Sequence, residues 1–183
     1  MIARVDIATD WASRMVASVK KNGDLRICID LQALNSALKR ELYPLPVIDD
    51  ILPDLNRARI FSKFDLKNGY WHCVLNEESS FLTAIQTDFV RYRWKRLPFG
   101  PAVSSEIFHK KLMQALEGLE GTMCVADDIL IYGTGESAAE AEIDLDKKVN
   151  ALLKRCAEVG IKLNKVKAEM KKLKQSFVIL HNL

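Results

Sequence analysis

Two adjacent aspartates, Asp127 and Asp128, stand between apolar segments on both sides. Apolar strands rarely tolerate two neighbouring charges unless something offsets their desolvation. Asp65 is a third acid that follows an apolar segment. Three carboxylates from two strand ends can hold a pair of Mg²⁺ ions about 3.5–4 Å apart, which clamp the attacking and leaving oxygens of a phosphoryl transfer. Taken alone, the Asp-Asp dipeptide is more typical of a tight turn, where an exposed Asp carries no such cost.

The acids need strands to position them, and the local patterns predict such strands. Residues 60–66 predict one strand, which ends at the turn Lys67-Asn68-Gly69. Residues 122–126 and 129–132 predict a hairpin with Asp127 and Asp128 at its tip. Both predicted elements place carboxylates at strand ends.

The rest of the chain alternates between strand and helix patterns. Further strands are predicted at residues 25–29, 70–75, 82–87 and 89–94, and strands or a strand-and-turn unit at 161–183. Helices are predicted at 31–38 with Asp30 as the cap, at 48–55, from Ser104 to Gly121, and from Ser137 to Gly160, the last opened by a capping box. This mixed order predicts an α+β fold, with helices packed on one face of a sheet.

Composition limits the class of protein. The chain has 183 residues, of which 49% are hydrophobic and 28% charged, with a net charge of +3. One globular domain is expected, and an intracellular protein, because neither a signal peptide nor an apolar membrane span is evident. Cys28, Cys73 and Cys124 lie inside apolar segments and lack the close spacing of zinc ligands, so buried reduced thiols are predicted.

An ordered set of segments carries a family resemblance. The central ones are residues 64–71 (Phe-Asp-Leu-Lys-Asn-Gly-Tyr-Trp), 96–100 (Arg-Leu-Pro-Phe-Gly), 104–108 and 125–133; the flanking ones are 20–30, Leu34-Asn35, 43–46, Leu163-Asn164 and Lys167. Together they closely resemble the reverse transcriptase of gypsy-like LTR retrotransposons, from about Asp10 to Phe177. The set is highly specific in this order, although no single segment would suffice.

The resemblance implies roles for the acids. Asp65, Asp127 and Asp128 would be the catalytic carboxylates of a site for two Mg²⁺ ions, for which Mn²⁺ could substitute. Asp65 and Asp127 would each ligate both ions, Asp128 would have a more supporting role, and the backbone carbonyl of Leu66 would complete a metal shell. Lys167 matches a lysine proposed to protonate the departing pyrophosphate. Without the resemblance, Lys167 would be one more lysine in a solvated segment.

The resemblance also implies a nucleotide site. Lys20, Lys21 and Arg26 would bring positive charge from a hairpin onto the incoming triphosphate. Tyr70 lies where the family places a bulky ring that excludes a ribose 2′-hydroxyl, and Phe99-Gly100 would lie near the templating base. By pattern alone, the hairpin is an ordinary solvated one and Tyr70 is a core aromatic residue.

Basic residues cluster in two segments. They are Arg91, Arg93, Lys95 and Arg96 in the first, and Lys162, Lys165, Lys167, Lys171, Lys172 and Lys174 in the second. Five acids collect between Glu136 and Asp146 and would face away from a duplex. This distribution favours an RNA or DNA template with its primer as the partner, bound through phosphates and weakened by salt. Basic segments of this kind are found equally often on protein surfaces where their charge only increases solubility. No membrane partner is expected, and the sequence leaves the oligomeric state open.

Some positions depart from the family pattern. Val125 and Ala126 precede the acid pair where Tyr is common at the first position, and Asp88 and Val90 replace Pro and Gly. Around Phe177 the family has a Phe-x-Gly-His turn that grips the primer, whereas this chain reads Phe-Val-Ile-Leu-His. Thumb and ribonuclease H segments are absent from the sequence, so weak primer binding is expected.

The sequence thus predicts the fingers and palm of a right-hand polymerase. The fingers would span approximately residues 1–58 and 78–100, and the palm, a split βαβ (ferredoxin-like) sheet backed by helices, residues 59–77 and 101–183. The predicted activity is RNA-directed DNA polymerisation by a truncated retrotransposon copy. The alternatives are a catalytically incompetent nucleic-acid-binding remnant and a metal-dependent cyclase with a related palm.

Overall fold

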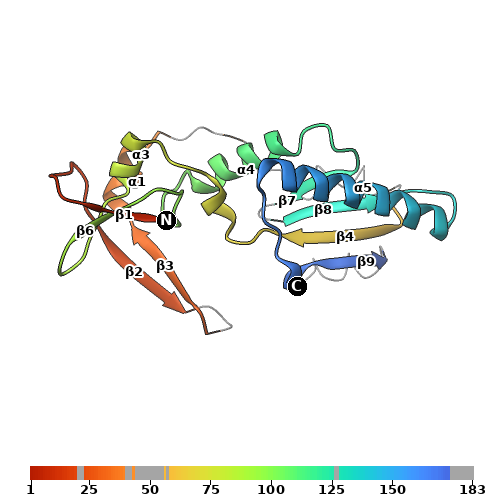
Figure 1. Cartoon of the computed structure of the whole chain (residues 1–183), viewed down its shortest axis with the longest axis horizontal. Coiled ribbons are helices and arrows are strands. Elements are labelled where there is room, and N and C mark those ends of the chain that lie inside the picture. The colour runs from red at the N-terminus through yellow and green to blue at the C-terminus, as the bar shows by residue number, and fades with distance from the viewer. Residues whose placement is uncertain (20–22, 40–42, 44–55, 57, 126–127, 174–183) are drawn as a thin grey trace. The chain divides into compact units, whose positions relative to one another are not determined.

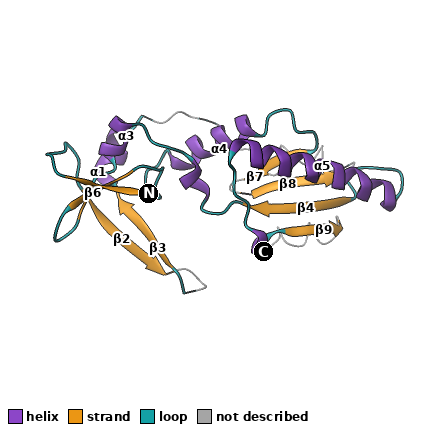
Figure 2. Ribbon diagram, in the orientation of Figure 1, coloured by secondary structure: helices purple, strands orange, loops and turns teal. Residues whose placement is uncertain are grey.

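A computed structural model of the chain describes residues 1–19, 23–39, 43, 56, 58–125 and 128–173, with the side chains of residues 26 and 27 left out. These residues fall into two compact units, one of residues 1–43 and 70–108 and one of residues 44–69 and 109–183. The described elements are strands and helices in mixed order (Figures 1 and 2). None of the helices in these ranges is both long and apolar enough to cross a membrane.

The first unit is built on a five-stranded sheet in the order β1-β6-β5-β2-β3. Its strands are β1 (Ile2–Val5), β2 (Ser13–Val19), β3 (Leu25–Asp30), β5 (Ile85–Gln86) and β6 (Arg91–Trp94). Two short helices, α1 (Gln32–Ala37) and α3 (Glu77–Leu82), and a 3-10 turn, η1 (Gly69–His72), accompany the sheet. The core consists of buried apolar side chains from strands and helix alike: Ile29, Leu31, Leu34, Ile85 and Trp94.

The second unit is built on an antiparallel sheet in the order β7-β8-β4-β9. Its strands are β4 (Ile60–Asp65), β7 (Thr122–Val125), β8 (Asp128–Gly133) and β9 (Glu169–Leu173). Between the strands fall the helices α5 (Ala138–Val159) and α4 (Ser104–Ala115), whose residues up to Phe108 are grouped with the first unit, and the 3-10 turn η2 (Lys165–Lys167) precedes β9. Along the chain the elements follow the order strand, helix, strand, strand, helix, strand. Together with the sheet order β7-β8-β4-β9, this is the predicted split βαβ arrangement.

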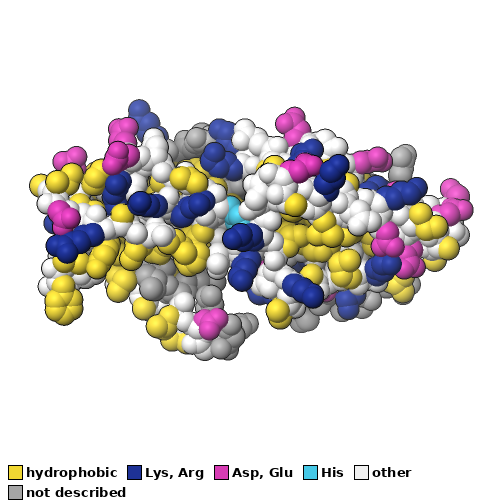
Figure 3. All heavy atoms as spheres, in the orientation of Figure 1, with side chains coloured by type: hydrophobic (Ala, Val, Ile, Leu, Met, Phe, Trp, Pro, Cys, Tyr) yellow, Lys and Arg dark blue, Asp and Glu magenta, His cyan; other side chains and the backbone are white. Residues whose placement is uncertain are grey.

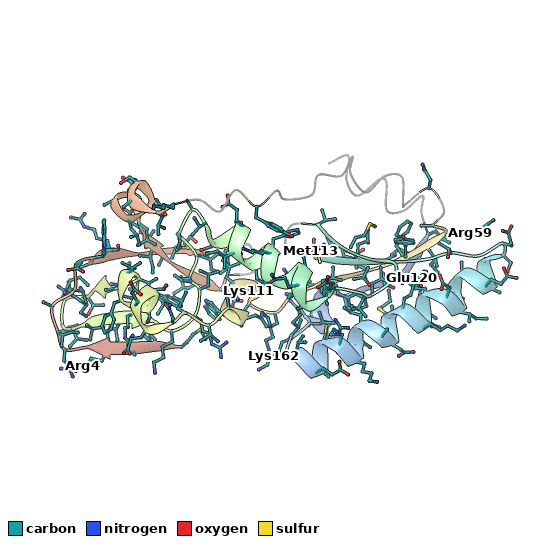
Figure 4. All side chains as sticks on the ribbon, turned by 90° about the horizontal axis from the view of Figure 1, so that it is seen from above. Arg4, Arg59, Lys111, Met113, Glu120 and Lys162 are labelled. Carbon is teal, nitrogen blue, oxygen red and sulfur yellow. The ribbon has the colours of Figure 1, made fainter. Side chains whose placement is uncertain are left out.

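Helix α5 lies along one side of this second sheet (Figures 1 and 4). Its buried side chains recur every three or four residues and form one stripe: Ala141, Leu145, Val149, Leu152 and Cys156. Ser137 and Glu140 form the predicted capping box at its start, and Gly160 takes a left-handed conformation at its end. A side chain at Gly133 would overlap the carbonyl oxygen of Ala141, so the close approach of α5 to β8 requires glycine.

Asp144 on α5 forms hydrogen bonds with the segment that follows β8. Its Oδ2 atom accepts hydrogen bonds from the backbone N and the hydroxyl of Thr134 at 2.8 and 3.0 Å, and Lys148 Nζ lies 2.7 Å away. Burial acts to raise the pKa of this carboxyl, but the bonds from Lys148 and Thr134 outweigh burial and hold the pKa below its usual value.

Several predicted elements are confirmed, including the strand that ends at Asp65, the hairpin of β7 and β8, and the helices that begin at Ser104 and Ser137. The strand predicted at 70–75 is wrong, because η1 and a bend occupy it. The strand predicted at 82–87 is reduced to β5, since α3 extends to Leu82. The cap of α1 is Leu31 rather than Asp30. The helix predicted at 48–55 lies outside the described residues.

All four cysteines lie in the described residues and are free thiols. Cys73, Cys124 and Cys156 are buried, whereas Cys28 is partly exposed. Burial raises the pKa of Cys124 to about 12 and that of Cys156 to about 11. The prediction of buried thiols is therefore confirmed for Cys73 and Cys124 and only partly for Cys28.

Candidate active site

The second sheet places two of the predicted carboxylates directly opposite each other. Asp65 is the last residue of β4 and Asp128 the first of β8, and the two are paired in the antiparallel register. Opposed residues of neighbouring strands project their side chains from the same face of a sheet. The side chains of Asp65 and Asp128 are 23% and 33% exposed, so both carboxylates are accessible to small ions.

Each of these carboxylates binds a different lysine. Lys167 Nζ lies 2.6 Å from Asp65 Oδ2, and Lys63 Nζ lies 2.8 Å from Asp128 Oδ2. Lys63 is two residues before Asp65 on β4 and therefore shares its face of the sheet. Like charges placed directly opposite are destabilising, and the two lysines offset that repulsion.

Backbone pairing brings Lys167 to Asp65. The N–H of Lys67 donates to the carbonyl of Lys162, and the N–H of Asn164 donates to the carbonyl of Asp65, both at 2.8 Å. In Figure 4, Lys162 lies near the end of the second sheet opposite to Arg59, the residue that precedes β4. The side chain of Asn164 accepts from the N–H of Val166 and starts η2, which carries Lys167. The Leu163-Asn164 segment thus positions the predicted proton donor.

Leu66, predicted as a backbone metal ligand, follows Asp65 directly and forms an isolated bridge with Leu163. Its side chain is buried, which fixes the local backbone. Asp127 lies outside the described residues, and the described part of the chain holds no cluster of three His, Cys, Asp or Glu side chains. The oxygen donors of Asp65 and Asp128 are nevertheless the ligand type that Mg²⁺ prefers, so the residues fit such an ion.

The first unit gathers the predicted aromatic residues of the nucleotide site. The ring of Tyr70 lies 4.6 Å from the ring centre of Phe99 and 5.4 Å from that of Phe108. Its hydroxyl shares a 2.8 Å hydrogen bond with that of Ser105. The Tyr70 ring is therefore held on two sides and at its tip.

The turn at Phe99 and Gly100 is fixed from β3 and α1. The N–H of Ile29 donates to the carbonyl of Phe99 at 3.2 Å. Asn35 bridges the turn, donating to the carbonyl of Gly100 at 3.1 Å and accepting from the N–H of Ala102 at 2.8 Å. Gly100 has φ +127°, and a side chain there would overlap the carbonyl oxygen of Ile29. Only glycine fits this turn without strain.

The hairpin residues predicted to contact the triphosphate lie largely outside the described residues. Lys20 and Lys21 lie outside the described residues, and Arg26 is described only as a backbone position of β3. Their predicted roles remain predictions.

The arginines predicted to contact nucleic acid make contacts within their own unit. Arg93 binds Glu77 at 3.1 Å and lies over the ring of Phe81, and Arg91 donates to Gln86 and Thr9. In the second unit, Lys171 binds Glu142 and Asp146 on α5. Acidic side chains gather over the N-terminal part of α5 (Figure 3). Some of the basic side chains therefore form ion pairs and hydrogen bonds within their own unit.

Sequence reasoning missed Lys63 and Ser105, and assigned no role to Asn35. A charged residue inside the otherwise apolar segment 60–66 was the available signal for Lys63. Ser105 and Asn35 were quoted only as parts of motifs, and their hydrogen bonds depend on residues far away in the sequence. No local pattern identifies such partners.

A family model described as "Reverse transcriptase (RNA-dependent DNA polymerase)" matches residues 19–180. The enzymatic polyprotein of figwort mosaic virus is 34% identical over 160 residues, which are 87% of this chain and 23% of that protein. The Pol polyprotein of transposon 412 from Drosophila melanogaster is 33% identical over 141 residues, 76% of this chain and 11% of that protein. The chain thus spans about a quarter or less of the length of these relatives.

Solved structures with the same fold include the foamy viral protease–reverse transcriptase in complex with double-stranded DNA. It has a TM-score of 0.79 and 23% identity, and the match covers 94% of this chain and 29% of that one. The same viral protein in complex with an RNA/DNA hybrid has a TM-score of 0.75 and 22% identity, covering 91% and 22% of the two chains. The predicted α+β polymerase fold is confirmed.

Proposed function

Since the chain belongs to the reverse transcriptase family, we propose that it carries out the central reaction of an RNA-directed DNA polymerase. In that reaction the 3′-hydroxyl of a primer attacks the α-phosphate of a template-selected dNTP. The new phosphodiester bond forms as the bond to pyrophosphate breaks, and the primer grows by one nucleotide.

The opposed pair Asp65 and Asp128 carries this proposal. Together with Asp127, which is adjacent in sequence, and the carbonyl of Leu66, these carboxylates would hold two Mg²⁺ ions. Bound Mg²⁺ would favour the ionised 3′-hydroxyl and stabilise the charge on the leaving oxygens. Because β4 and β8 are hydrogen-bonded along their length, the two acids keep a fixed separation, and fixed groups need little rearrangement during the reaction.

Lys167 is the proposed proton donor. Its ammonium group is bound to Asp65 and its side chain is 63% exposed, so Nζ can reach a neighbouring phosphate without losing access to water. A proton passed from Nζ to the departing pyrophosphate would neutralise one of its charges. The pairing of residues 162–164 with 65–67 keeps the lysine at the carboxylates until that step.

The nucleotide is proposed to bind through residues of the first unit. Tyr70, packed between Phe99 and Phe108, would exclude a ribose 2′-hydroxyl. The turn at Phe99-Gly100 would lie at the base, and Lys20, Lys21 and Arg26 would contact the triphosphate. The fingers would span about residues 1–58 and 78–100 and the palm residues 59–77 and 101–183, with a primer–template as the partner.

Primer extension on an RNA template tests the proposal. The 183-residue chain is incubated with a labelled DNA primer, dNTPs and Mg²⁺ or Mn²⁺, and products are resolved by length, alongside Asp65→Asn. Asp88, an exposed acid in a turn of the first unit, provides the matched control Asp88→Asn.

We expect weak primer-dependent addition by the chain and by Asp88→Asn, because the turn that would grip the primer is altered, and its loss in Asp65→Asn. Equal extension by Asp65→Asn would contradict the assigned role of the acids. Salt-sensitive binding of the primer–template in a filter assay without any extension would instead identify a binding remnant.

A further inference from the structure

Lys63 is a charged residue in the middle of a buried strand. Its neighbours in β4 include Phe61 and Phe64, which are 1% and 4% exposed, whereas the Lys63 side chain is 31% exposed. Exposed lysines are common, but a lysine inside a strand of this kind needs a partner for its ammonium group. That partner is Asp128.

The sheet register accounts for the Lys63–Asp128 contact. Lys63 is paired with Leu130, so Asp128 is its diagonal neighbour on the same face of the sheet. Diagonal neighbours lie about 7–8 Å apart at their backbones, a distance that a lysine side chain spans. Its Nζ reaches Oδ2 of Asp128 at 2.8 Å. The ion pair therefore follows from the same strand pairing that places Asp128 opposite Asp65.

This contact occupies an atom that a metal ion would use. A carboxylate oxygen that accepts from an ammonium group at 2.8 Å must give up or share that bond when a cation binds it. An ion pair with both partners about one-third exposed is weak, because water screens the two charges. It is strong enough to hold the carboxylate in place, and weak enough for a divalent ion to displace the lysine.

We propose that Lys63 is a positioning residue of the site, which holds the Asp128 carboxylate before a divalent cation binds and competes with that cation for it. Lys63 thereby lowers the affinity of the carboxylate pair for the metal. This inference rests on the proposed role of Asp65 and Asp128 as metal ligands.

Titration with Mn²⁺, followed by the paramagnetic resonance signal of the free ion, tests the proposal on the whole 183-residue chain without primer or nucleotide. The variants are Lys63→Met, which keeps the length of the side chain without its charge, and Lys63→Arg, which keeps the charge. Lys154→Met is the control, because Lys154 is exposed on α5, which covers the other face of the sheet. Asp65→Asn identifies the binding event that belongs to the carboxylate pair.

We expect Lys63→Met to bind Mn²⁺ roughly five- to thirty-fold more tightly than the wild type, the range for removing one charge about 4 Å from a doubly charged ion in a site open to water and salt. Lys63→Arg and Lys154→Met should stay within about twofold of the wild type on the same grounds. Lys63→Gln repeats the measurement with a polar side chain should circular dichroism show that Lys63→Met is unfolded.

Two results would overturn the proposal in different ways. In the first, Lys63→Met binds Mn²⁺ as tightly as the wild type or more weakly, and Asp65→Asn has lost binding. This result would show that Lys63 does not compete with the ion, while the metal site itself remains. Binding in Asp65→Asn equal to that of the wild type removes the metal site itself, and the role of Lys63 with it.

Discussion

The hydroxyl groups of Tyr70 and Ser105 lie 2.8 Å apart and share a hydrogen bond. Tyr70 belongs to the turn after β4, and Ser105 is the second residue of α4. The bond fixes the tip of a ring whose two neighbours, Phe99 and Phe108, fix its orientation. In the proposed nucleotide site, a ring restrained in this way would exclude a ribose 2′-hydroxyl by its position as well as its size.

Replacing Tyr70 with Val should raise the use of rNTPs relative to dNTPs, because the space taken by the ring becomes available to a 2′-hydroxyl. Tyr70→Phe and Ser105→Ala each remove the hydrogen bond while keeping the ring, and should produce a smaller change in the same direction. The measurement is the ratio of the kcat/KM values for dNTP and rNTP incorporation. A ratio unchanged in Tyr70→Val would return this residue to a core role.

Gly100→Ala should destabilise the first unit by about 3 kcal/mol or more, since the new methyl group adds an overlap with Ile29 to a strained φ of +127°. Gly23→Ala is the matched control. Gly23 has φ +86° with open space around it, so its substitution should cost only about 1 kcal/mol. Urea unfolding of both variants measures the difference, and equal losses would show that the contact with Ile29 relaxes freely.

Asp144→Asn should lower the free energy of unfolding at neutral pH by about 1–2 kcal/mol, because the ion pair with Lys148 is lost. The pKa of Asp144 is lowered in the folded chain, so its ionised form stabilises the fold. That contribution is present above the unfolded pKa, near 3.8, and is lost as the pH falls through the folded value.

Wild type and Asp144→Asn should therefore differ at pH 7 and converge as the pH falls below the unfolded value. Urea unfolding at a series of pH values provides the comparison. A difference that persists undiminished at the lowest pH would assign the effect to the hydrogen bonds of Thr134 rather than to the charge.

Lys165→Ala should weaken the binding of a primer–template and make it less dependent on salt, since Lys165 is exposed in η2. A lost phosphate contact reduces the slope of log affinity against log salt by about 0.9. Lys154→Ala on α5 is the control, because it makes the same change of charge at an exposed position on the helix that covers the other face of the sheet. Filter binding between low and moderate salt measures both slopes. Identical slopes in the two variants would exclude a specific contact by Lys165.

The sequence predicted best where one local signal dominates. The capping box at Ser137 and the left-handed Gly160 fixed both ends of α5, and the apolar segment before Asp65 predicted β4. The prediction failed at residues 70–75, where a largely apolar segment suggested a strand. The chain instead turns at Asn68, which has φ 60°, and the Tyr70 ring then packs on Phe99 and Phe108.

Two other elements show why such failures occur. Asn76 accepts a hydrogen bond from the N–H of Ser79 and caps α3, a local signal that the strand prediction overlooked. Strand β1 carried no comparable signal, because it is defined by its pairing with β6, almost the whole first unit away in sequence. The opposed carboxylates were predictable as a set from their motifs. Their two lysines were not, because ion pairs depend on register and side-chain reach.

The order of the second sheet bears on how the protein is made. Strand β4 lies between β8 and β9, and both neighbours are synthesised after it. During translation β4 therefore leaves the ribosome with neither edge paired, and pairing must wait for distant segments. The contact between Asp65 and Lys167 closes a separation of 102 residues. The face that carries Asp65 and Asp128 is thus completed late in synthesis, and a nascent chain that stops before β9 leaves one edge of β4 unpaired.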